Sequence, residues 1–283
     1  MKKTMFMFAA ALMMVACSNE EVAVNDDVKY VTELKLNFGS GDSRVAATHN
    51  PASGLKFAWE EGEEIQVYEN ANANAITLYY VYDESTQSFK PKNESYKMVA
   101  GTEYFAVKGV RSTNQALSVE DGKTIVKMYS EEDDRFGLPV IPMITDVFTA
   151  DAGGAIATMH HLVGVVEIPV KLDASSTKVE AKQFKLYSNG GKLARNFTAK
   201  PESPYLNEVS EAYTTAVSEE KTYVLSKDEA TSVFIPVLPG THNSVQLTYC
   251  WGDAGNKTTS LGMNITVERG KITKINEETI TLD

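Results

Sequence analysis

The sequence has little of the residue types that would narrow its chemistry. It contains two cysteines, so no disulfide framework holds it together. Of its four histidines, His160 and His161 are adjacent and would point to opposite faces of a strand, while His49 and His242 stand alone in predicted loops. Such spacing does not suit a metal site. We therefore expect no metal and no cofactor.

The sequence also lacks the motifs of common enzymes. It has no G-x-S-x-G, and its glycine pairs Gly153–Gly154 and Gly190–Gly191 lack the lysine and helix of a phosphate site, so they indicate turns. The acidic run from Glu131 to Asp134 is typical of a solvated loop, with a pair of glycosidase carboxylates as the alternative. Cys250 is interpreted as an inert small residue. We expect that the chain has no catalytic residues and is not an enzyme.

Basic residues are outnumbered, with 27 Lys and Arg against 38 Asp and Glu and a net charge of −11. A chain with this charge repels phosphate backbones, so nucleic acid is excluded as a partner. It also lacks a basic patch for anionic lipid, so any membrane attachment needs another anchor.

The first residues supply such an anchor. Lys2 and Lys3 precede an apolar run that ends at Cys17, the pattern of an export signal over residues 1–16. The run is too short to cross a bilayer, which needs about 20 residues, and it has no polar face. Its end, MVAC, resembles the lipobox of bacterial lipoproteins. That resemblance implies cleavage between Ala16 and Cys17 and acylation of the Cys17 thiol, which would then sit in outer-membrane lipid.

Residues 17–29 form an acidic tether that begins SNEE after the cysteine. A short acidic run at this point resembles the surface-export signal of Gram-negative anaerobes. The alternative is a solvated spacer, which the same composition would give.

From Tyr30 the pattern has period two. Leu34, Leu36 and Phe38 alternate with polar residues, which predicts a strand with one buried face that ends at Gly39. The segment that follows, SGDSR, is turn chemistry and predicts an exposed loop containing Arg44. Leu55–Trp59 and Ile65–Val67 flank a turn and predict a hairpin. Further short strands without helical periodicity indicate an all-β fold.

A small, flexible stretch, ADAGG at 150–154, lies near the middle of the chain left after signal removal. We place a boundary there, with one β-sandwich domain over residues 30–150 and a second over 151–283. The second contains the run MHHLVGVVEIPVKL and ends in a strand in which Ile280 and Leu282 alternate with polar residues.

Several segments together resemble the fimbrillin family, the subunits of surface fimbriae called type V pili. They are the lipobox, the early strand before Arg44, FAWEEGEEIQVY, VIPMIT, MHHLVGVVEI and SVFIPVLPGTH. The resemblance spans nearly the whole chain. It implies two transthyretin-like (Ig-like) β-sandwich domains in tandem, exported as a lipoprotein precursor to the outer membrane and cell surface.

The resemblance also implies how such a subunit assembles. In fimbrillins an arginine-directed protease cuts after the first strand, which here would place the cut between Arg44 and Val45 and remove the strand of Leu34, Leu36 and Phe38. A strand from another copy or a related subunit then fills the groove. The candidate donor residues here are Ile280 and Leu282. Host or bacterial surface ligands would be further partners in adhesion by the fimbria.

Two alternatives remain open. A subunit that keeps its first strand or has no free donor would be a non-polymerising anchor or tip. A surface-exposed lipoprotein that binds glycan or protein would need an aromatic platform, for which Tyr79, Tyr80, Tyr82 and Trp251 are candidates, although strand core explains these residues more simply.

Overall fold

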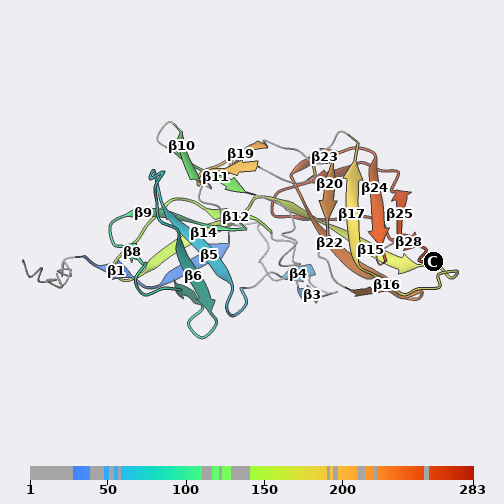
Figure 1. The fold of residues 1–283 in the computed structure, drawn as a ribbon, viewed down its shortest axis with the longest axis horizontal. Helices are drawn as coiled ribbons and strands as arrows, with labels where there is room; N and C mark the ends of the chain where they lie inside the picture. Colours follow the sequence, from blue (N-terminus) through green and yellow to red (C-terminus); the bar gives the residue numbers. More distant parts are fainter. Residues whose placement is uncertain are drawn as a thin grey trace, which may run out of the picture.

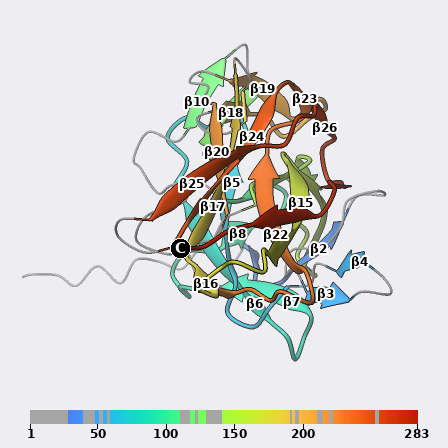
Figure 2. The ribbon, with the colours of Figure 1, turned by 90° about the vertical axis from the view of Figure 1, so that its right-hand side faces the viewer.

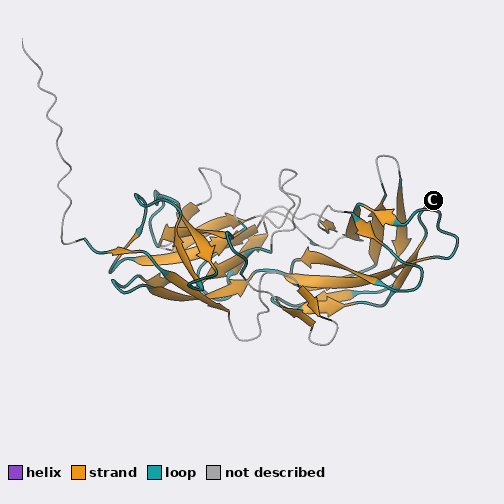
Figure 3. Ribbon diagram, turned by 90° about the horizontal axis from the view of Figure 1, so that it is seen from below, coloured by secondary structure: helices purple, strands orange, loops and turns teal. Residues whose placement is uncertain are grey.

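The structure is a computed structural model that describes residues 28–38, 48–50, 54–56, 59–109, 117–120, 123–128, 141–189, 192–193, 197–209, 214–218, 222–251 and 255–283. All regular elements within these ranges are β-strands (Figure 3), so the expected all-β class is confirmed. Over the same ranges, no helix has the length and apolar character needed to cross a membrane.

The strands form two groups that lie side by side along the long axis (Figure 1). The N-terminal group is an eight-stranded sheet in the order β12-β14-β2-β7-β6-β5-β9-β13. Its strands are β2 (Leu34–Phe38), β5 (Glu64–Glu69), β6 (Leu78–Asp83), β7 (Ser88–Pro91), β9 (Glu103–Lys108), β12 (Met143–Thr145), β13 (Phe148–Thr149) and β14 (Ala155–His161). Two short pairs accompany it: β1 (Tyr30–Val31) with β8 (Met98–Val99), and β3 (Thr48–Asn50) with β4 (Gly54–Lys56).

This sheet closes on itself because β12 pairs along both of its edges. Ile144 lies opposite His160 of β14 and opposite Val107 of β9. A continuous ladder therefore runs from β12 through β14, β2, β7, β6, β5 and β9 and back to β12. Inside it lies an apolar core with fully buried side chains, among them Leu34 and Tyr80. Closure leaves few unpaired strand edges in this group.

The C-terminal group is a sandwich of two sheets (Figure 2). One has the order β20-β17-β24-β25; the other has the order β22-β15-β27, with β28 also paired to β15. The strands are β15 (Gly164–Leu172), β17 (Gln183–Ser188), β20 (Thr215–Val217), β22 (Thr231–Val237), β24 (Val245–Cys250), β25 (Asn256–Ser260), β27 (Ile272–Lys274) and β28 (Glu278–Ile280). Short pairs are β16 (Glu180–Ala181) with β21 (Tyr223–Val224), and β23 (Gly240–His242) with β26 (Ile265–Val267).

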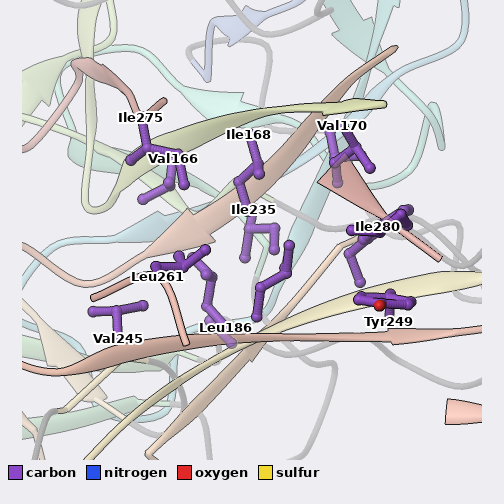
Figure 4. Packing of buried hydrophobic residues seen from close by; sticks show 14 of the residues in the cluster. Val166, Ile168, Val170, Leu186, Ile235, Val245, Tyr249, Leu261, Ile275 and Ile280 are labelled. Atoms are coloured by element: carbon purple, nitrogen blue, oxygen red, sulfur yellow. The ribbon is translucent and has the colours of Figure 1, made fainter. Parts of the chain in front are cut away.

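The core of this sandwich lies between its two sheets (Figure 4). Val166 and Ile168 of β15 lie on one side, and Leu186 and Val245 lie on the other. Residues of β17 and β24 alternate between buried and partly exposed, as strands with one buried face do. In contrast, β15 is buried along almost its whole length, which means that both of its faces are covered.

Proline interrupts one edge of β15. On that edge Val165–Glu167 pair in parallel with β27, and Val170–Leu172 pair in parallel with β28. Pro169 lies at the gap between these two ladders. Because proline has no N–H to donate, a continuous ladder across it would lose a bond. The proline therefore separates β28 from β27.

A third set of contacts joins the two groups. A four-stranded sheet combines β10 (Leu117–Glu120) and β11 (Lys123–Met128) with β18 (Phe197–Ala199) and β19 (Leu206–Val209). Beside it lies a buried apolar cluster drawn from both halves of the chain: Tyr68, Phe105, Val107, Val126, Ile144, Leu162, Val163, Ala199, Tyr205 and Leu238.

The strand groups meet at Leu162 and Val163 rather than at residues 150 and 151, where the sequence placed the boundary. Backbone hydrogen bonds of 3.2 and 3.0 Å between Asp151 and Gly154 close a tight turn. After this turn the chain enters β14, which belongs to the same sheet as the strands before the turn. The small residues therefore form a turn within the N-terminal group. Leu162 and Val163 are buried where the chain passes to β15, and a buried crossing lacks the polar signal of a linker.

The hairpin expected from Leu55–Trp59 and Ile65–Val67 is wrong. Both edges of β5 are occupied, by β6 at Ile65 and by β9 at Val67. The preceding segment therefore has no free edge of β5 to pair with. Leu55 lies instead in β4, which pairs with β3, and Trp59 lies outside any strand.

A polar cluster also links the two halves. The Tyr205 hydroxyl donates to Asp146 Oδ1 at 2.8 Å, and His160 Nε2 lies 3.1 Å from Asp146 Oδ2. The rings of Tyr205 and His160 stack at 4.4 Å between centroids. The Arg269 guanidinium lies over the Tyr205 ring, 4.8 Å from its centroid, and donates a hydrogen bond to the His161 carbonyl at 3.3 Å. Tyr205 therefore contacts Asp146, His160 and Arg269 and lies at the centre of this polar cluster, which we call the junction.

We expect Tyr205→Ala to destabilise the protein by about 3 kcal/mol, because it leaves a cavity and removes both ring contacts. Tyr205→Phe keeps the ring and should cost about 1 kcal/mol for the lost hydroxyl bond. Urea unfolding followed by fluorescence measures both. Equal losses for the two variants would show that the ring contacts do not hold the junction.

Candidate functional site: the first and last strands

The first strand of the sheet, β2, lies inside the closed ladder between β14 and β7. Along β14 it pairs in parallel over its whole length, from Leu34 opposite Ala155 to Phe38 opposite Met159. Along β7 it pairs at one position, Leu34 with Phe89. Removing β2 would break the closed ladder and expose the edges of β14 and β7.

The three apolar residues of β2 are not equally buried. Leu34 is fully buried in the N-terminal core, whereas Leu36 and Phe38 are partly buried and pack against its rim. Phe38 stacks on Trp59 with centroids 5.5 Å apart. The alternation expected for this strand is therefore present, and its burial weakens toward Phe38.

A buried tyrosine fixes the chain just before β2. The Tyr80 hydroxyl donates to the Val31 carbonyl at 2.9 Å and accepts from the Met98 N–H at 3.0 Å. Burial raises the pKa of Tyr80 to about 12. The same bonds hold β1 against β8, so this tyrosine anchors the segment that leads into the first strand.

Four of the expected site residues lie outside the described residues. These are the signal-cleavage and lipidation positions Ala16 and Cys17 and the protease positions Arg44 and Val45. The described chain stops six residues before Arg44, at Phe38, and resumes at Thr48.

Of the expected donor residues, Ile280 ends the last strand, β28, and Leu282 follows it, and both are buried in the core of the same chain. Ile280 is 1% exposed and Leu282 is 0% exposed. Ile280 lies opposite Leu172 of β15, and Figure 4 shows it above Tyr249. In this structure the last strand therefore completes its own sandwich.

The loop after β15 binds the backbone that follows β28. The N–H of Asp173 donates to the Ile280 carbonyl at 2.7 Å, and the N–H of Thr177 donates to the Leu282 carbonyl at 2.9 Å. Ser176 Oγ accepts from the N–H of Leu282 at 3.2 Å. These bonds hold the segment at both of its apolar residues.

Two side chains then bind the backbone oxygen of Asp283. Trp251 Nε1 donates to it at 2.9 Å and Lys178 Nζ donates at 2.6 Å, with the Lys178 amino group also over the Trp251 ring. Gly255 lies against that ring, where an added Cβ would sit 2.3 Å from Nε1. A larger residue at 255 would displace the indole.

Sequence reasoning missed Trp59 and the 173–178 loop. Among the aromatic candidates, Tyr80 is core, while Tyr82 is partly exposed and Trp251 binds the last residue. Trp59 could have been noted as an aromatic residue beside the charged turn EEGEE. The loop carried no comparable signal, because its backbone donors depend on the fold.

Comparison with protein-family models finds no match, and comparison with curated proteins finds none either. Solved structures do match. A candidate cell adhesion protein from Bacteroides ovatus aligns with TM-score 0.55 and 16% identity, over 89% of this chain and 93% of that one. The chain has the fold of that protein.

Two further solved structures are more distant in geometry. A candidate cell adhesion protein from Bacteroides fragilis aligns with TM-score 0.49 and 12% identity, over 89% of this chain and 93% of that one. A fimbrial protein from Bacteroides vulgatus aligns with TM-score 0.43 and 11% identity, over 87% and 95%. Of these three structures, the Bacteroides ovatus protein has a TM-score above 0.5, and the likeness in fold rests on it.

We expect Leu282→Ala to destabilise the protein by about 3 kcal/mol, because it opens a cavity in a fully packed core. Thr279→Ala, at an exposed position of β28, is the matched control and should change stability by less than about 0.5 kcal/mol. Denaturant unfolding compares the two. Equal, small effects would show that the last strand contributes little to its own sandwich.

Stability should fall as pH rises from about 10 to about 12. Over this window an unfolded tyrosine loses its proton near pH 10, while buried Tyr80 keeps its proton to about pH 12. The folded state then binds more protons, so raising the pH favours unfolding. Urea unfolding near pH 9 and pH 11 measures the fall, and Tyr80→Phe should make it smaller by about 1 kcal/mol. An unchanged slope would contradict this account of Tyr80.

Proposed function

We propose that this chain is a structural subunit of a cell-surface fimbria, exported as a lipoprotein precursor, which assembles by donor-strand exchange and supports adhesion. The observation that carries the proposal is the place of β2. It is the first strand of the sheet, it lies between two partners, and Arg44 follows it in the sequence. Its loss would open a slot of one strand's width.

The likeness to the Bacteroides ovatus protein supports the proposal through the fold that the two share. The leader supports it through location. A chain acylated at Cys17 would reach the outer membrane and the cell surface, with Lys2, Lys3 and the apolar run removed after Ala16.

Removal of β2 would create a strong demand for a replacement. Leu34, Leu36 and Phe38 all pack on the N-terminal core, and exposing such side chains costs about 25 cal/mol for each Å² of apolar surface. The unpaired backbone groups of β14 and β7 add to that cost. An incoming strand would recover both contributions, which is the principle of strand addition.

The last strand has the properties that this slot requires. β28 pairs in parallel with β15, as β2 pairs in parallel with β14. Ile280 and Leu282 alternate as Leu34 and Leu36 do. We therefore propose that the Glu278–Asp283 segment of a neighbouring copy, or of a related subunit, enters the slot once the 173–178 loop releases it.

The contacts of the last strand favour a second candidate function. Because the last strand is bound within its own sandwich, a chain that never releases it would be a non-polymerising anchor or tip subunit, held to outer-membrane lipid through Cys17. Such a subunit would keep β2 and contact host or bacterial surface ligands directly.

Cleavage decides between the two. An arginine-specific protease should yield a fragment that begins at Val45, and that fragment should form polymers visible by size-exclusion chromatography and electron microscopy. Arg44→Lys, which keeps the charge but is no substrate for such a protease, should stay uncut at this position and monomeric.

N-terminal sequencing of material sheared from cells reports the natural form. A start at Val45 is expected for a fimbrial stalk. A start at Cys17, or a cut chain that stays monomeric, contradicts the stalk and favours the anchor or tip subunit.

A further inference from the structure

A groove of about 550 Å³ opens beside the second half of β2. Beyond Leu34 this strand has no pairing with β7, and it runs instead beside the turn that joins β6 to β7. We call this space the aromatic groove. It is lined by Lys35, Leu36, Asn37, Phe38, Trp59, Tyr82, Glu84, Thr86, Gln87 and Phe89. Its volume lies within the range of small-molecule sites, about 300–1,000 Å³.

The aromatic rings of the groove hold each other in place. Trp59 stacks on Phe38 and meets Phe89 edge-on, with centroids 4.8 Å apart. Tyr82 in turn contacts Phe89 at 5.2 Å. The Lys108 amino group lies 4.9 Å from the centre of the Trp59 ring. Phe89 is buried, whereas Phe38, Trp59 and Tyr82 are each partly exposed to the groove side of the molecule.

The opposite wall is a turn with a fixed shape. Asp83 Oδ1 accepts from the backbone N–H of Ser85 at 2.9 Å and of Thr86 at 3.3 Å, and Asp83 Oδ2 pairs with Lys90 at 2.5 Å. Gln87 completes the turn with a φ of 51°, a backbone conformation that residues other than glycine rarely adopt. The turn therefore presents its polar side chains from a defined backbone.

The rim carries amide, hydroxyl and charged groups of both signs. Asn37, Thr86 and Gln87 are exposed, and the charges of Lys35 and Glu84 balance. Such a rim does not select a strongly charged ligand. It offers both donors and acceptors beside apolar ring faces.

We propose that the aromatic groove is a binding site for a neutral oligosaccharide. One face of a sugar ring is a set of C–H groups that packs on an aromatic ring, while its edge carries hydroxyls that both donate and accept hydrogen bonds. Phe38 and Tyr82, which are partly exposed and line the groove, match the face, and Asn37 and Gln87 match the edge.

An extended peptide fits this groove less well. β2 is unpaired with β7 only over Lys35–Phe38, so the free edge that an added strand could pair with is short. The groove also needs Leu36, Asn37 and Phe38, so binding would be a property of the chain that keeps β2. It can therefore be tested on uncut protein, whether or not the cut form polymerises.

The test uses tryptophan fluorescence, because the chain has two tryptophans and the Trp251→Phe variant leaves Trp59 as the reporter. The uncut Trp251→Phe protein is titrated with maltohexaose, cellohexaose, xylohexaose and mannohexaose. At least one should change the Trp59 emission with a saturable curve. Adding Asn37→Ala and Gln87→Gly, the latter keeping the positive φ, should weaken that binding about tenfold.

Asn276→Ala removes an exposed amide far along the chain and should leave the titration unchanged. Three results overturn the proposal: no change with any of the four oligosaccharides, a change that the Asn37 and Gln87 substitutions do not affect, or saturable binding of a peptide spanning Ile275–Asp283 in place of the sugars. The last would make the groove a strand-entry site. Circular dichroism of each variant confirms that it is folded.

Discussion

The parallel pairing between β2 and β14 is the interaction on which the N-terminal half depends. It closes a ladder that would otherwise end in two open edges, and it places Leu34 in the core. The first strand contributes to this half more than its length suggests, because its loss affects its own side chains and the backbone of both neighbours.

The sequence predicts the strands well where one face is buried. The alternation of Leu34, Leu36 and Phe38, and of Ile280 and Leu282, marks two strands that the structure contains. Short strands without helical periodicity predicted an all-β fold, which the structure and the Bacteroides ovatus match support. Short-range patterns suffice for these conclusions, because strand periodicity is local.

Pairing partners are a different matter, since they depend on contacts far apart in the sequence. Nothing in the residues around Ile144 shows that β12 has partners on both edges. The turn at Asp151 and Gly154 has the composition of a linker and the role of a hairpin turn. The alternating pattern predicted that Trp59 belongs to a strand. In the structure both edges of β5 are paired with other strands, and Trp59 lines a groove instead.

Pro169 gives the last strand an energetic independence of its own. Because the proline divides the edge of β15, β28 is held by its three-residue ladder, the 173–178 loop and its two buried side chains, with no shared hydrogen bonds to β27. Its detachment would thus be a local opening, while β22 and β27 keep β15 covered. The pairing of β15 with β22 and β27 does not itself depend on β28.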